Sequence, residues 1–170
     1  MKLTPEQKNR LENMYQTFLH DEKILKMKEI PMHRGSNTYE HSFKVAKKAI
    51  KHALRYKDVN LESILIASIL HDYYLYDWRS DHSKRKKHGK NHPYIASDNA
   101  KIDFDISSEV ERIIKSHMWP LNFKMFPNSK EARIVSMADK MVASIESLSS
   151  KKHKNVHRQK YLDKIDRLFD

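Results

Sequence analysis

The residues best suited to chemistry in this sequence are an adjacent histidine and aspartate, His71 and Asp72. They follow residues 64–70, an apolar run that is almost free of polar groups. Adjacent residues on a helix point about 100° apart. The pair can therefore hold one ion from two sides, or the carboxylate can bridge two ions.

Four more side chains of the same kinds lie on other predicted helices, mostly near their ends. They are His41, His92, His117 and Asp139. Asp139 has apolar neighbours, and an unpaired carboxylate in such company is costly unless it binds a metal or another cation. One histidine at a helix end most often caps or packs, but four imidazoles and two carboxylates together predict a metal site. These ligands suit one or two ions of Fe, Mn, Zn, Co or Ni.

The composition predicts an all-α, single-domain, compact helical bundle over residues 1–170. The length suits one domain with a real core, and the residues are 39% hydrophobic and 32% charged. Only two glycines occur, which argues against a sandwich, a barrel or a glycine-rich nucleotide loop. The sequence has no cysteine, so a metal site must use histidine, aspartate, glutamate and water.

Capping residues and apolar periodicity predict where the helices lie. Thr4 caps the first, which runs to about Leu25, and His92 with Pro93 begins the fourth. The predicted helices span about residues 5–25, 38–56, 61–72, 92–100, 107–117, 129–146 and 161–169. Residues 73–91 are expected to be a long irregular connection, and residues 147–154 a loose one. The basic run at residues 84–90 is either a solvated loop or a rim that holds substrate phosphates.

The formal net charge of +11 favours phosphate-bearing partners, although it also suits a simply basic protein. Nucleotides, nucleic acid and an anionic membrane surface all carry such phosphates. No stretch approaches the roughly 18–20 apolar residues that span a bilayer, and the first thirty residues do not resemble a secretory signal. We therefore expect a cytoplasmic protein without a membrane partner.

The ordered set His41, His71-Asp72 and Asp139 resembles the HD-domain superfamily of metal-dependent phosphohydrolases. The resemblance covers about residues 34–146. It implies an all-helical domain in which the His-Asp pair ends a helix. It also implies that these four residues bind the first metal.

His92 and His117 resemble the branch of that superfamily that holds a second metal, with Asp72 as the bridge. The branch includes HD-GYP-type cyclic dinucleotide phosphodiesterases and symmetrical diadenosine tetraphosphate hydrolases. No Gly-Tyr-Pro element follows His117, which makes cyclic dinucleotide cleavage less favoured. Residues 73–75 stand where many relatives have a short polar stretch with Gly and Lys, which points to an unusual substrate-facing wall.

The resulting hypothesis is a phosphomonoesterase or phosphodiesterase that uses metal-activated water on a nucleotide or related small phosphate ester. The predicted catalytic residues are His71, Asp72 and Lys44. The predicted substrate contacts are Arg34, Arg79, His88, Lys140, Trp78 and Trp119. Glu40 and Asp77 are candidates to orient the ligand histidines because they are close in sequence. Tyr73 and Tyr76 could stack on a base, with core packing as the alternative.

Two other functions fit the sequence. The charge and the basic run would suit a metal-dependent nuclease on single-stranded nucleic acid. The aromatic residues 73–78 would suit a non-catalytic nucleotide-binding sensor. Oligomeric state is left open.

Overall fold

The computed structural model describes residues 2–32, 36–79, 82–148 and 165–169. Regular structure in these ranges is helical, apart from one isolated bridge between Pro31 and Asn37. The elements are α1 (Pro5–His20), α2 (Glu22–Leu25), the 3₁₀ helix η1 (Lys26–Glu29), α3 (Thr38–Ala53), α4 (Leu61–Leu70), α5 (His82–Phe104), α6 (Ser108–Ser116) and α7 (Lys130–Leu148). The all-α prediction is confirmed. None of the described helices is long and apolar enough to cross a bilayer.

Most helix starts follow the predicted capping residues. Thr4 and Gln7 form a reciprocal capping box at α1, Asn37 caps α3 and Ser107 caps α6. The first helix does not continue to residue 25, because Asp21 adopts an extended backbone and its carboxylate caps α2. A side chain that accepts backbone N–H groups locally thus ends one helix and begins the next.

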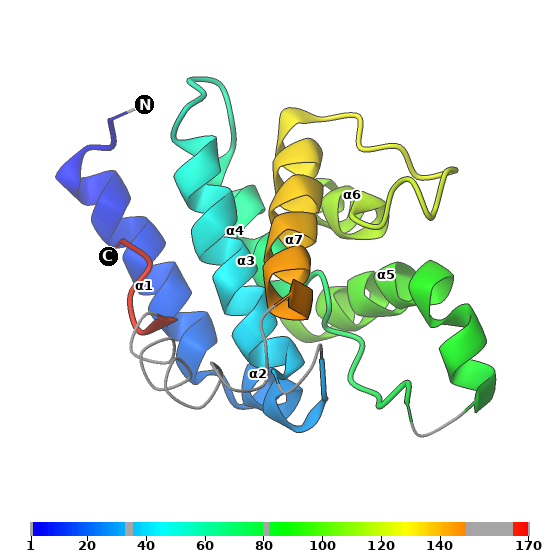
Figure 1. The fold of residues 1–170 in the computed structure, drawn as a ribbon. Coiled ribbons are helices and arrows are strands. Elements are labelled where there is room, and N and C mark those ends of the chain that lie inside the picture. The colour runs from blue at the N-terminus through cyan, green and yellow to red at the C-terminus, as the bar shows by residue number, and fades with distance from the viewer. Residues whose placement is uncertain (1, 33–35, 80–81, 149–164, 170) are drawn as a thin grey trace.

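Helices α3, α4 and α7 form the centre of the domain, with α1 on one side and α5 and α6 on the other (Figure 1). The apolar run of α4 is enclosed: Ile64, Leu65, Ile69 and Leu70 are fully buried. Burial of this whole segment is its main source of stability. It also places whatever follows Leu70 inside the protein.

Helix α5 differs from the prediction. It begins at His82 and continues to Phe104, so Pro93 lies inside it and the basic run lies on its first turns. Lys and Arg are good helix formers, and one proline removes a single N–H and bends a helix rather than ending it here. Figure 1 shows α5 changing direction along its length. Of the predicted irregular connection, residues 73–79 are indeed not helical.

The chain end packs against α1 (Figure 1). The Tyr15 hydroxyl donates to the carbonyl of Ile165 at 2.6 Å, and the N–H of Leu168 donates to Glu12. Ile165 and Leu168 are buried. The rest of the predicted C-terminal helix, residues 161–164, and most of the loose connection lie outside the described residues.

Candidate metal centre

The six predicted ligands meet in one buried cluster. His71 and His117 are the C-caps of α4 and α6, so each follows the last turn of a helix that points into the core. The other ligands come from neighbouring elements: His41 from α3, Asp72 from the turn after α4, His92 from α5 and Asp139 from α7. Relative exposures are 0% for His41, 0% for His71, 3% for Asp72, 4% for His92, 1% for His117 and 8% for Asp139.

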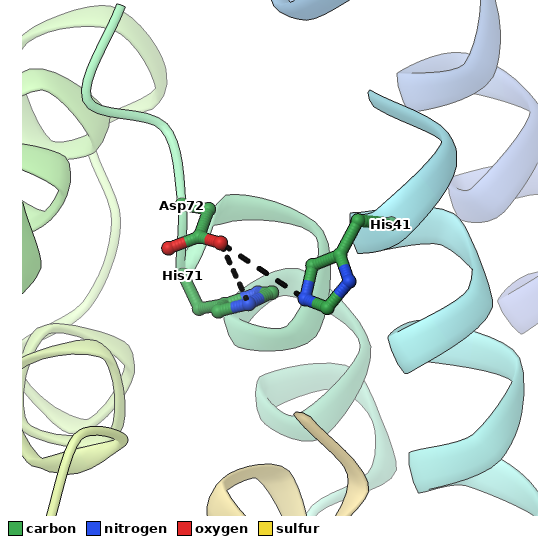
Figure 2. A group of neighbouring side chains, drawn as sticks. All are labelled: His41, His71 and Asp72. Carbon is green, nitrogen blue, oxygen red and sulfur yellow. Dashed lines mark ion pairs between the residues drawn. The ribbon is translucent and has the colours of Figure 1, made fainter. Parts of the chain in front are cut away.

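The first half of the cluster contains two histidines and two aspartates. Asp139 Oδ1 lies 3.1 Å from His41 Nε2 and 3.7 Å from His71 Nε2. Asp72 Oδ2 lies 3.4 Å from His71 Nε2 and 4.0 Å from His41 Nε2. Figure 2 shows one Asp72 oxygen facing both rings. Ligand atoms of His41, His71 and Asp72 all lie within 4.8 Å of one another, and so do those of His71, His117 and Asp139.

The second half uses the other oxygen of the same aspartate. Asp72 Oδ1 lies 3.2 Å from His92 Nε2 and 3.8 Å from His117 Nε2. The two Nε2 atoms of His92 and His117 are 3.0 Å apart. One carboxylate therefore divides its oxygens between two histidine pairs, which is the arrangement of a ligand that bridges two ions.

Backbone carbonyls fix the tautomers of three of these histidines. Nδ1 of His71, His92 and His117 lies 2.8, 2.9 and 2.7 Å from a carbonyl oxygen one turn earlier in the chain. The acceptors are the carbonyls of Ser68, His88 and Ile114. Because a carbonyl can only accept, each Nδ1 carries the proton. A neutral ring then presents its Nε2 lone pair as a metal ligand.

The unpaired nitrogen atoms fit a bound cation. Nε2 of His71 is buried and has no hydrogen-bond partner. In the neutral tautomers, the lone pairs of His92 and His117 face each other across 3.0 Å. A buried acceptor without a partner is costly, and a positive ion in each half of the cluster would satisfy these three nitrogen atoms. Nitrogen and carboxylate donors together suit a divalent transition metal.

The electrostatics of the cluster also favour positive charge. Burial lowers the pKa of His41, but hydrogen bonds with Asp139 and Glu146 outweigh it and raise the pKa to about 9. Burial works against the ionised Asp72 and Asp139, yet the neighbouring histidines hold both pKa values well below the usual range. The pKa of His117 falls to about 3 through burial and the charges of nearby histidines. A metal would take the place of the protons that the carboxylates hold on the rings.

Glu146 is a member of the centre that the sequence analysis missed. Its Oε2 accepts from Nδ1 of His41 at 2.8 Å, and its Oε1 accepts from Nζ of Lys44 at 2.9 Å. The side chain is 9% exposed. Glu146 lies seven residues, or about two turns, after Asp139, so both carboxylates share the inner face of α7. This seven-residue spacing is the sequence feature from which Glu146 could have been predicted.

Of the other polar candidates on this side, Lys44 lies against Glu146. Glu40 accepts from the Asn37 amide at 3.4 Å, and Asp77 accepts from the N–H of Arg79. The carboxylate that contacts Nδ1 of His41 belongs to Glu146 on α7, which is far from His41 in sequence.

A cavity of about 660 Å³ opens beside the cluster. Asp72, His92, His117 and Asp139 line it, whereas His41 and His71 lie behind. The other lining residues are Met32, Trp78, His88, Gly89, Met118, Pro120, Leu121, Lys140 and Ala143. Three of the predicted substrate contacts, Trp78, His88 and Lys140, are therefore at the cavity.

Two of the remaining predicted contacts, Trp119 and Arg79, are not among the residues that line this cavity. Trp119 lines a separate groove, and Arg79 lies over the Trp78 ring and donates to the carbonyl of Met32. Arg34 is outside the described residues. Tyr73 is buried, and its hydroxyl donates to Asp103, which agrees with core packing. In the basic run, the described Arg85, Lys87 and Lys90 are exposed on α5.

Comparison with known proteins gave one family. The model of the HD domain matches residues 38–144, which contain all six ligand candidates. No curated protein and no solved structure matched the chain.

Proposed function

Because this chain belongs to the HD-domain family, which generally comprises metal-dependent hydrolases, we propose that it is a phosphohydrolase acting on a small phosphate ester. The observation that carries the proposal is the position of Asp72. Its two oxygens face separate pairs of histidine Nε2 atoms. Carboxylate-bridged pairs of metal ions are well suited to phosphoryl transfer.

The ligands fall into two groups with different tasks. In this proposal His41, His71 and Asp139 hold the inner ion, His92 and His117 hold the outer ion, and Asp72 serves both. When bound, divalent ions would supply an activated water near neutral pH and positive charge for the phosphoryl oxygens. The outer group has one carboxylate and two imidazoles and opens on the cavity, which leaves room for water and substrate.

The neighbouring residues keep this geometry. Glu146 holds His41 by its Nδ1, and the three backbone carbonyls hold the other rings. Each Nε2 is thereby aimed before any ligand binds, so little reorganisation is needed during catalysis. Fe, Mn, Zn, Co and Ni are all compatible with such donors.

A small phosphorylated molecule fits the available space. Ligand cavities are typically about 300–1,000 Å³, and this one is about 660 Å³. The charge of +11 favours phosphate-bearing substrates, with nucleotides among them. A cytoplasmic location would suit such a substrate and the absence of cysteine.

The test combines metal analysis with turnover. Protein purified without chelator should contain up to two transition-metal ions per chain and release phosphate from members of a panel of phosphate esters. His71→Ala should lose bound metal and activity, because it removes a fully buried ligand. His20→Ala, an exposed histidine on α1, is the matched control. Metal-free protein together with an active His71→Ala variant would contradict the proposal.

A further inference from the structure

The walls of the metal cavity have few groups that could recognise a polar substrate. Apart from the four metal ligands, the described lining contains three side chains with polar atoms: His88, Lys140 and Trp78, whose indole Nε1 is buried without a hydrogen-bond partner. Met118, Pro120 and Leu121, which are close in sequence, belong to the apolar part of the lining. This composition constrains the part of the substrate that extends beyond the phosphoryl group.

Lys140 already uses its hydrogen-bond donors within the protein. Its ammonium lies 2.9 Å from the carbonyl of His117, 2.6 Å from Ser136 Oγ and 3.2 Å from the Ser136 carbonyl. An ammonium has three protons, and three acceptors surround this one. Among the described lining residues, a second or third phosphate would therefore find no other cationic side chain and no unused ammonium proton.

The aromatic faces at the cavity are also covered. The Trp78 ring is stacked on His88, with centroids 4.9 Å apart and planes at 13°, and Arg79 lies over the Trp78 ring. His88 is in turn stacked on His92 at 4.6 Å. A nucleobase needs an open ring face for stacking. Neither Trp78 nor His88 offers one without rearrangement.

What the cavity does offer is an aliphatic wall. Gly89 on α5 leaves space for Leu121, because a Cβ there would come within 2.9 Å of Leu121 Cδ2. Beyond Pro120 and Lys140, which line both spaces, a second groove of about 560 Å³ includes Met141 and Ile145. That groove adds apolar surface from these two residues, together with polar groups from Arg133, Ser136 and Ser144.

We propose that the substrate is a phosphate monoester of an apolar aliphatic alcohol, small enough to fit the cavity. Its phosphoryl group lies at the metal ligands, and its alkyl group lies on the wall formed by Met118, Pro120 and Leu121. This inference rests on the proposed phosphohydrolase function. In the reaction, water adds to phosphorus and the phosphorus–oxygen ester bond breaks. The alcohol leaves with a proton taken from the water, and inorganic phosphate remains.

The experiment compares esters whose leaving groups are equally basic. n-Hexyl phosphate and ethyl phosphate differ by four methylene groups, and burying even part of them should raise kcat/KM for the hexyl ester about tenfold. AMP is the polar comparison. We expect it to be a poorer substrate than n-hexyl phosphate.

Two variants on one loop connect the preference to the wall. Leu121→Asn should reduce the hexyl-to-ethyl ratio severalfold, because it puts an amide on the wall. Phe123→Asn is the matched control: Phe123 is 74% exposed and lines neither described space. It should leave the ratio unchanged.

The outcomes separate this inference from the proposed function. Metal-dependent turnover with AMP preferred over n-hexyl phosphate would overturn the apolar substrate and leave the phosphohydrolase intact. A ratio near one, or one unaffected by Leu121→Asn, would also overturn it. No metal-dependent turnover of any ester would instead contradict the phosphohydrolase itself.

Discussion

The two halves of the metal centre share Asp72 but differ in their surroundings. Besides Asp72, the inner half has His41, His71 and Asp139, and Glu146 contacts both His41 and Lys44. The outer half has His92 and His117, and both of them line the cavity. Two fully buried histidines and a second carboxylate favour a permanent ion in the inner half. Fewer ligands and an open side favour an ion that exchanges and meets substrate.

The largest expected effect comes from the residue that both halves share. Asp72→Ala should reduce metal content in both halves and bring phosphatase activity to background, because each half loses an oxygen donor. Inductively coupled plasma mass spectrometry and phosphate release measure the two results. Retention of two ions per chain would show that Asp72 is not the bridge.

The outer half can be removed separately. His92→Ala should retain one tightly bound ion and lose most activity, since His41, His71 and Asp139 are untouched. In the wild-type protein, stepwise addition of chelator should likewise remove one ion well before the other. Simultaneous loss of both ions would contradict the proposed difference between the halves.

A smaller effect is expected from the carboxylate behind His41. Glu146→Gln should weaken metal binding to the inner half about 10–100-fold, because a neutral amide holds the ring less strongly than a carboxylate does. Glu131→Gln is a matched control on the same helix: Glu131 is also buried but accepts from the N–H of Asn60. Equal metal affinities in the two variants would exclude an orienting role for Glu146.

The smallest effect should come from a site remote from both halves. Thr4→Ala removes one side of the capping box of α1 and should lower the free energy of unfolding by about 1 kcal/mol. Denaturant unfolding measures it. Metal content and turnover should not change, and a change in either would show that α1 is coupled to the metal centre.

Features that depend on nearby residues were predictable. The caps Thr4, Asn37 and Ser107 bond to N–H groups within three residues, so residue types and spacing suffice. The apolar run before His71 likewise indicates a buried helix whose end is inside. The continuation of α5 through Pro93 was not predictable in this way, because tertiary packing can outweigh the local preference of one residue.

The sequence by itself determined the ligand types: without cysteine, only histidine, carboxylate and water remain. Through the order of His41, His71-Asp72 and Asp139 it also indicated the family. Only the tertiary structure decided that Asp72 faces two histidine pairs and that Glu146 holds His41 from 105 residues away. It also decided that the Lys140 ammonium donates a hydrogen bond to the carbonyl of His117. Such contacts join distant helices, and their geometry is set by how those helices pack rather than by local spacing.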